Sequence, residues 1–206
     1  MEWTRFRVKL QFRDKVLAGL PSDPKALRAA MAAREAPPEV VAEVADSLED
    51  APETDGCVFR RDEDGIWVRS SQVKAAIKEC CSRLGLTLSV RGLRQHLQHG
   101  VFVRPERLRF VGKTQPDGEE VRAGNPMTAR GPRSVLRWYE YVERGVLEFE
   151  LWVAPTAGSV GKRGVADALA NIETWRDIWA LAAENGLGAA RSQGYGTFDV
   201  LELATA

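Results

Sequence analysis

The sequence predicts an α+β fold in which an antiparallel sheet carries its helices on one face. Three observations predict this fold class. Apolar and polar side chains alternate as in strands near both ends of the chain, two internal segments show the 3–4 spacing of amphipathic helices, and the elements follow one another as strand, helix, strands, helix and strand. A length of 206 residues suits one domain spanning residues 1–206, with insertions at about 21–55 and 112–134.

The first strand is expected over residues 5–13, where apolar and mostly basic side chains alternate. One face of this strand is therefore apolar, and the other is positively charged. Its apolar positions are Phe6, Val8, Leu10 and Phe12. The basic face has two interpretations that the sequence leaves open: it contacts an acidic ligand, or it forms ion pairs with Glu148 and Glu150 on a neighbouring strand.

An acidic, helical insertion is expected at about residues 21–55. Its Ala-rich segments carry many carboxylates and are interrupted by a Pro-Pro pair, which favours an excursion over the surface. The chain then returns to the sheet in a hairpin, because strand-like residues 57–60 and 66–68 flank an Asp-Gly turn.

The next helix is expected to begin at Ser70 or Ser71, whose hydroxyl would cap its first turn. Its apolar positions follow the 3–4 spacing, and Gly85 ends it. These apolar positions are Val73, Ala76, Ile77, Cys80 and Leu84. Lys74 and Lys78 lie off the apolar stripe and are available to a ligand.

The middle of the chain combines short elements with a long basic segment. A helical piece over residues 93–99 leads to a strand over about 101–110. Residues 112–134 are expected to form a basic loop or mobile hairpin, because glycine and proline punctuate them without any period. Two strands, 134–143 and 146–153, follow this segment.

The strongest helix is expected over residues 165–185, and Gly186 ends it. Its apolar stripe includes Trp175 and Trp179, which we expect in the core rather than on a base-stacking surface. A final strand covers about 195–203. With the two insertions set aside, the order of the elements is that of a ferredoxin-like (RRM-type) antiparallel sheet with helices on one face.

Charge is unevenly distributed along the chain, although the formal net charge is zero. Residues 66–137 carry fourteen Lys or Arg against five Asp or Glu, whereas the segments 21–65 and 138–206 are both acidic. Phosphate binding depends on the local potential, so the basic segment indicates a contact with nucleic acid. Alternating basic and acidic segments would also suit a chain that stacks on copies of itself.

Two segments resemble the RAMP superfamily, the ferredoxin-fold proteins that build and process CRISPR RNA complexes. The first, DEDGIWVRSSQVKAAI at residues 62–77, is similar to the family's strand and Gly-Ser-Ser-x-(Leu/Val)-Lys helix start, with Arg69 in place of the glycine. The second, GLGAARSQGYGTF at residues 186–198, is similar to the family's glycine-rich loop before the last strand. The resemblance implies an RNA-binding backbone subunit, in which residues 112–134 form a "thumb" that reaches over the bound strand.

The candidate binding residues come from these two segments and from the basic segment. Closely spaced glycines let a backbone approach phosphates, arginine binds phosphate bidentately, tyrosine stacks on bases, and a helix N-terminus favours an anion. The predicted nucleic-acid-binding residues are Arg69, Ser70, Ser71, Lys74, Lys78, Lys113, Arg122, Arg130, Arg133, Arg137, Gly188, Arg191, Gln193, Gly194 and Tyr195. The glycine-rich segment also has a plainer explanation, a helix C-cap followed by a turn.

His96 and His99 are the candidates for catalytic chemistry. A zinc site with Cys80 and Cys81 is disfavoured, because the sequence contains no Cys-x-x-Cys pair. A histidine acting as general base on a ribose 2′-hydroxyl would make the chain a metal-independent endoribonuclease. RAMP nucleases place such a histidine near the first helix, which neither residue matches, so we assign no catalytic residue, metal or cofactor.

The predicted function is a subunit that binds single-stranded nucleic acid, RNA before DNA, and assembles as adjacent copies or within a ribonucleoprotein. Three alternatives stay open: a stand-alone single-stranded DNA-binding protein on the same fold, for instance one encoded by a phage; the endoribonuclease; and a purely structural assembly subunit. No apolar stretch approaches the length of a membrane span, and three cysteines without a disulfide framework suit a reducing, cytoplasmic location.

Overall fold

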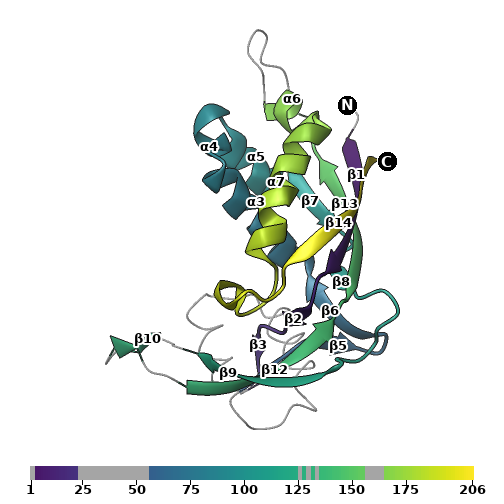
Figure 1. Ribbon diagram of the computed structural model, residues 1–206. Helices are drawn as coiled ribbons and strands as arrows, with labels where there is room; N and C mark the ends of the chain where they lie inside the picture. The colour runs from purple at the N-terminus through teal and green to yellow at the C-terminus, as the bar shows by residue number, and fades with distance from the viewer. Residues whose placement is uncertain (1–2, 23–55, 125–126, 129–130, 133–134, 156–164) are drawn as a thin grey trace.

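A four-stranded antiparallel sheet is the main layer of the structure, which is a computed structural model (Figure 1). The order of its strands is β14 (Phe198–Thr205), β1 (Thr4–Phe12), β13 (Val146–Val153) and β7 (Val101–Arg104), with every neighbouring pair antiparallel. The structure describes residues 3–22, 56–124, 127–128, 131–132, 135–155 and 165–206. Residues 23–55 of the expected acidic insertion lie outside this description. The predicted α+β class with antiparallel sheets is confirmed.

The helices lie on one face of this sheet. Figure 1 shows α3 (Ser70–Arg83) and α7 (Ile172–Asn185) side by side against it, with the short α4 (Leu86–Ser89) and α5 (Leu93–His99) beyond α3. None of the helices in the described part of the chain is long and apolar enough to cross a membrane.

The core lies between the sheet and these helices, as the alternation in the first strand predicts. Trp175 and Trp179 of α7 are 0% and 1% exposed, which confirms that they belong to the core. The ring of Trp175 lies 5.9 Å from that of Phe6 in β1, and the ring of Trp179 lies 5.8 Å from that of Phe149 in β13. Burial of these four rings contributes apolar stabilisation to the interface between the sheet and α7.

The last helical segment is not continuous. It divides into α6 (Val165–Ala170) and α7, with Asn171 between them in an extended conformation. The side-chain oxygen Oδ1 of Asn171 accepts a hydrogen bond from the backbone N–H of Glu173 at 3.0 Å, and so caps the first turn of α7. Asparagine favours such caps over helix interiors, so the prediction of one uninterrupted helix was wrong at this residue.

Two further sheets, of five and three strands, extend the molecule beyond the main sheet. One contains β2 (Lys15–Leu17), β12 (Val135–Glu143), β4 (Gly56–Val58) and β3 (Leu20–Pro21), in that order, and β9 (Gly118–Gly124) also pairs with β12. The other contains β5 (Arg60–Asp62), β6 (Gly65–Arg69) and β8 (Arg107–Arg109). The hairpin with an Asp-Gly turn is confirmed as β5–β6, whereas residues 57–58 belong to β4. The strand expected over 101–110 is divided between β7 and β8.

Part of the expected loop over residues 112–134 is a strand. β9 runs antiparallel to β12 from Gly118 opposite Tyr141 to Gly124 opposite Val135, and the short β10 (Met127–Thr128) and β11 (Gly131–Pro132) pair beyond it. Figure 1 shows this β9–β12 arm projecting from the end of the molecule farthest from the termini. Val121 of β9 is 62% exposed, whereas Glu120 is partly buried. The less exposed side chain is thus a charged one, which is why no apolar period marks this strand in the sequence.

Ion pairs neutralise most of the basic face of β1. Lys9 Nζ lies 2.5 Å from a Glu148 carboxylate oxygen, and this contact raises the pKa of Lys9. Arg7 lies 3.7 Å from Glu202, and Arg13 pairs with both Glu184 and Asp199 at 2.8 Å. The expected pairing with the neighbouring strand is therefore confirmed for Lys9 and Glu148 only. Arg7 and Arg13 pair with other carboxylates, and Glu150 instead accepts a hydrogen bond from the Trp152 indole N–H.

Candidate nucleic-acid interface

The glycine loop, residues 186–196, links α7 to β14 and requires glycine at several positions. Gly186, Gly188, Gly194 and Gly196 all have positive φ. A Cβ atom on Gly196 would lie 1.7 Å from the carbonyl oxygen of Leu187, so the loop folds tightly onto itself. A helix C-cap followed by an ordinary turn would not need this density of left-handed residues, because one such residue suffices.

Hydrogen bonds close the glycine loop on itself and hold it against β2. The N–H of Leu187 donates to the Gly196 carbonyl at 2.9 Å, that of Ala189 to the Leu17 carbonyl at 3.0 Å, and that of Gly196 to the Lys15 carbonyl at 2.9 Å. These three amides are therefore not available to a phosphate that approaches the backbone of the loop. A ligand at this loop would meet side chains first.

Tyr195 of the loop joins a polar cluster that the sequence did not predict. Its hydroxyl donates to Glu120 Oε1 of β9 at 2.7 Å, and Lys15 Nζ of β2 donates to Glu120 Oε2 at 2.9 Å. Arg122 also pairs with Glu120, and its guanidinium lies 5.1 Å from the centre of the Tyr195 ring. Lys15 in turn lies 4.2 Å from the ring of Tyr141. We call Lys15, Glu120, Arg122, Tyr141 and Tyr195 the Glu120 cluster.

Electrostatics in the Glu120 cluster favour the charged form of the carboxylate. Burial alone would raise the pKa of Glu120, but the hydrogen bonds from Lys15 and Tyr195 outweigh it and hold this pKa below its ordinary value. Burial and the contact with Glu120 raise the pKa of the Tyr195 hydroxyl, which stays protonated and donates. Three elements far apart in the sequence thus direct donors onto one carboxylate, where they would equally suit a phosphate oxygen.

The start of α3 differs from its predicted geometry. Arg69 occupies the cap position, and neither Ser70 nor Ser71 caps the helix, because no side chain forms a capping hydrogen bond there. Instead, the N–H of Ser70 donates to the backbone carbonyl of Glu106 at 2.8 Å. The turn between β7 and β8 therefore already satisfies one of the amides on which an anion was expected to bind.

Lys74 points away from the start of its helix. Its Nζ donates to the carbonyl of Gln98 in α5 at 2.8 Å and lies 5.1 Å from the ring of Phe102 in β7. Burial, with a smaller contribution from Lys78, lowers the pKa of Lys74. Lys78 lies one turn further along α3 with its side chain exposed. The Lys74 ammonium is therefore engaged by α5 and β7 and not by the glycine loop.

The two segments that resemble the RAMP family meet at a small cavity. Gln72 and Val73 of α3 line it together with Leu187 and Gly188 of the glycine loop, and Trp67 of β6 forms part of its wall. The cavity measures about 70 Å³, enough for water but not for a base. The segments are therefore packed against each other, and any ligand must bind on the surface around them.

The other predicted cations are mostly engaged with acidic or carbonyl groups. Arg191 lies 3.0 Å from Glu79 of α3, and Lys113 pairs with Asp117 and donates to the Glu143 carbonyl at 2.6 Å. Arg137 lies opposite Arg122 in the β9–β12 pairing. Gln193 and Gly194 lie in the glycine loop. Arg130 and Arg133 lie outside the described residues.

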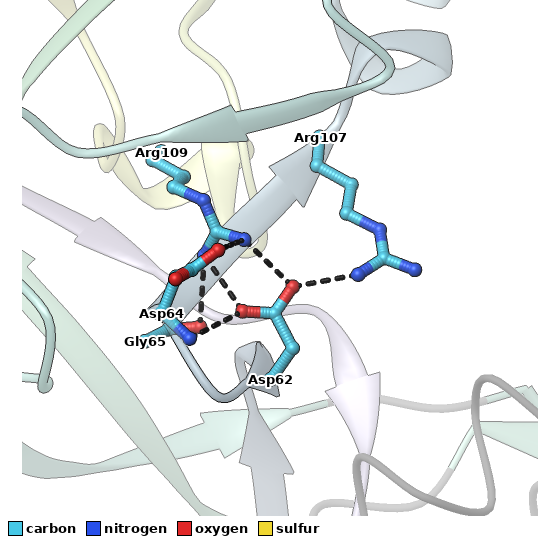
Figure 2. A network of polar contacts seen from close by, with 5 residues as sticks. All are labelled: Asp62, Asp64, Gly65, Arg107 and Arg109. Carbon is cyan, nitrogen blue, oxygen red and sulfur yellow. Dashed lines mark hydrogen bonds and ion pairs between the residues drawn. The ribbon is translucent and has the colours of Figure 1, made fainter.

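A network around Asp62 fixes the hairpin that precedes α3 (Figure 2). Arg109 binds both carboxylate oxygens of Asp62, at 2.7 and 2.8 Å, and Arg107 binds one of them at 2.7 Å. Arg109 also pairs with Asp64 at 3.0 Å. The acidic turn of the first RAMP-like segment is thus an anchor for β8, and its arginines are occupied within the protein.

Asp62→Asn is expected to lower the free energy of unfolding by about 2 kcal/mol at pH 7, because it weakens the charge-assisted contacts with Arg107 and Arg109. The Arg109 hydrogen bonds lower the pKa of Asp62 and outweigh the effect of burial. Its stabilisation is therefore present above the unfolded pKa of about 3.9 and is lost as the pH falls through the lower, folded value. Urea titrations should show the gap between the two proteins closing in acid. An equal gap at pH 7 and at pH 2 would contradict this assignment.

The histidines and cysteines do not assemble into a metal site within the described residues, which hold no group of three or more potential ligands. Burial lowers the pKa of His96, whose Nε2 is buried without a hydrogen-bond partner in the described part of the chain. All three cysteines are buried thiols, and burial raises the pKa of Cys81 to about 12. His99 lies at the exposed end of α5.

Among solved structures, the fold is similar to that of a chain in the cryo-electron-microscopy structure of the type III-B Cmr-beta bound to cognate target RNA. The TM-score is 0.51 at 12% sequence identity, and the similarity covers 99% of this chain and 61% of that chain. This chain therefore spans less than two thirds of the length of its structural neighbour. No family model matches the sequence. A search of curated proteins finds no match either.

Proposed function

We propose that this chain binds single-stranded nucleic acid, RNA in preference to DNA, as a subunit of a ribonucleoprotein that contains copies of itself or other subunits. In this proposal the main sheet is the ferredoxin-like core of a RAMP-type subunit. The β9–β12 arm is its thumb. The chain is a binding subunit with no active site of its own.

One observation carries the proposal: the glycine loop, β2 and the base of the β9–β12 arm meet at the Glu120 cluster. There a tyrosine ring, an arginine and a lysine lie around one carboxylate on the surface of the molecule. Aromatic rings that stack on bases, and cations that contact phosphates, are the groups by which proteins bind single strands without sequence preference. The likeness to a chain from an RNA-bound assembly supports the same function.

Binding at this surface would exchange internal ion pairs for contacts with phosphate. Glu120 neutralises Arg122 and Lys15, and Glu79 neutralises Arg191. A phosphate that displaces a carboxylate gains a charge-assisted contact but must overcome the pair already present. Affinity should therefore be moderate and should fall steeply as salt is added.

Glu120→Gln is expected to strengthen binding of a single-stranded RNA about 3-fold to 10-fold at low salt, because it releases Lys15 and Arg122 from a competing charge. If one additional phosphate contact forms, the plot of log affinity against log salt should steepen by about 0.7. Fluorescence anisotropy across a salt series measures both quantities.

Glu173→Gln is the matched control for this variant. Glu173 pairs with Arg176 on the exposed surface of α7, so the same change in net charge occurs away from the glycine loop. Equal effects of the two substitutions would show that only overall charge matters. Weaker binding by Glu120→Gln would show that the cluster stabilises the fold and does not compete with phosphate.

Nucleic acid that copurifies with the protein gives the first test of the proposed function. The ratio of absorbance at 260 and 280 nm, followed by extraction and digestion with RNase or DNase, identifies it. RNA of uniform length is the expected result. DNase-sensitive material would favour the stand-alone single-stranded DNA-binding alternative. A clean protein that also fails to bind added oligonucleotides at low salt would overturn the proposal and leave the purely structural role.

A further inference from the structure

A second surface, distant from the glycine loop, combines aromatic rings with cations. The helices cover one face of the main sheet, and the outward side chains of β1, β13 and β7 lie on the other (Figure 1). At the end of the sheet near the termini, the ring of Trp3 lies 5.7 Å from that of Phe102 and 6.2 Å from that of Trp152. Trp3 is 38% exposed, and the other two rings are half-buried.

Three cations surround these rings. The Arg5 guanidinium lies 4.1 Å from the centre of the Trp152 ring, and Arg104 lies 5.8 Å from that of Phe102. Lys74 approaches Phe102 from α3 at 5.1 Å. We call Trp3, Arg5, Lys74, Phe102, Arg104 and Trp152 the aromatic–cation patch.

The cations of this patch differ from the other basic residues on the sheet. Within the described ranges, Arg5, Lys74 and Arg104 form no ion pair, whereas Arg7, Lys9 and Arg13 of the same sheet are all paired. The carboxylate nearest in the register, Glu150, instead accepts a hydrogen bond from the Trp152 indole N–H at 2.7 Å. The patch therefore keeps a positive potential beside partly exposed aromatic surface.

We propose that the aromatic–cation patch is a second binding site for single-stranded nucleic acid, at which unpaired bases stack on Trp3 and Phe102 while Arg5 and Arg104 contact phosphates. This inference rests on the proposed function and extends it to a second surface. A ligand that matches the patch must offer flat apolar faces and negative charge at close spacing, as bases and their phosphates do. A protein partner would need to bury three cations that form no ion pair within the described residues, which is costly unless the partner is strongly acidic.

The two sites lie at opposite ends of β1. The N–H of Arg13, just after this strand, donates to the Thr197 carbonyl next to the glycine loop at 3.0 Å, while Trp3 immediately precedes the strand. Ten residues of extended chain place the sites roughly 30 Å apart. A strand that contacts both would cross the open face of the sheet, and a short oligonucleotide would reach only one.

The test compares a single-stranded RNA with an abasic phosphodiester strand of the same length. Trp3→Ala combined with Phe102→Ala is expected to weaken RNA binding about 10-fold or more, since loss of one base-stacking contact costs this much in single-strand binders. Binding of the abasic strand should be unchanged, because its phosphates remain and it has no bases to stack. Leu88→Ala, at an apolar position on α4 that is 91% exposed, is the control and should leave both affinities unchanged.

Several outcomes would overturn this inference. If the parent protein binds RNA but the double variant binds it equally well, the patch is not a nucleic-acid site, although the proposed function stands. An equal loss on both strands would exclude stacking. A change in oligomeric state by light scattering, with RNA affinity unchanged, would make the patch a protein interface. If the parent protein binds no nucleic acid, both the proposed function and this inference are wrong.

A second variant covers the case in which the alanine protein does not fold. Trp3→Leu with Phe102→Leu retains apolar bulk at both positions but removes the rings, so the fold should persist while stacking is lost. Its expected result is the same selective loss on the base-containing strand. Undiminished RNA binding by the leucine variant would equally overturn the inference.

Discussion

Replacing Gly196 by alanine is expected to lower the free energy of unfolding by about 3 to 5 kcal/mol, one of the largest effects available to a single methyl group in this chain. The added Cβ would lie 1.7 Å from the Leu187 carbonyl oxygen, and φ at Gly196 is +73°. The carbonyl oxygen belongs to the backbone and the Cβ is attached rigidly to it, so neither atom can rotate away. The hydrogen bond from the Leu187 N–H to the Gly196 carbonyl would have to break. Urea denaturation followed by circular dichroism measures the loss.

Gly194→Ala is the matched control in the same loop. Gly194 also has a positive φ, of +88°, but no atom lies within 4 Å of a Cβ placed there. Its expected cost is therefore the conformational strain alone, about 1 to 2 kcal/mol. Equal destabilisation by the two substitutions would contradict the close backbone contact at Gly196. If the glycine loop also positions Tyr195 for nucleic acid, Gly196→Ala should weaken RNA binding and Gly194→Ala should leave most of it.

Glu140→Ala is expected to cost about 3 kcal/mol, because it leaves two groups without their acceptor. Glu140 lies in β12 and is 7% exposed. Its carboxylate pairs with Arg61 and accepts the backbone N–H of Phe59 at 2.8 Å. Loss of one member of a buried pair is normally worth about 3 to 5 kcal/mol, and the partial exposure of Arg61 places this case at the lower end.

Glu148→Ala is the control, because it removes a glutamate from an exposed ion pair instead of a buried one. Glu148 lies in the neighbouring β13 and pairs with Lys9, but both side chains are substantially exposed. An exposed pair contributes less than about 1 kcal/mol. Urea titration measures the free energy of unfolding of both alanine variants. Comparable values would show that the contacts of Glu140 with Arg61 and Phe59 contribute no more than an exposed ion pair.

The main sheet is the part of the fold that the sequence predicts best. Period-two alternation over residues 5–13 and 146–153 predicts β1 and β13, because burial on one face constrains every second side chain. The same logic predicts α7 from its tryptophan stripe. β9 is predicted only as part of a loop or mobile hairpin, because it has no apolar period and is held by backbone hydrogen bonds to β12, on which sequence has little influence.

The candidate site is predicted only in part. Glycine spacing identifies the loop that contains Tyr195, because left-handed backbone favours glycine over every other residue. The acceptor for Tyr195 lies 75 residues away in Glu120, and the partner of Arg191 lies 112 residues away in Glu79. Such pairings depend on which strands become neighbours, so local composition indicates a surplus of positive charge without showing where it is neutralised.

The sequence by itself thus determines the α+β class, the core of the main sheet and the position of the glycine loop. Each of these follows from a local periodicity or from a conformation that one residue type favours. Only the tertiary structure decides which cations are neutralised by carboxylates and which remain available to attract a ligand. It pairs Lys113, Arg122 and Arg191 with carboxylates and leaves Arg5 and Arg104 beside aromatic rings. The physical reason is that Coulomb energy depends on distance in space, which the chain acquires only when its sheets pair.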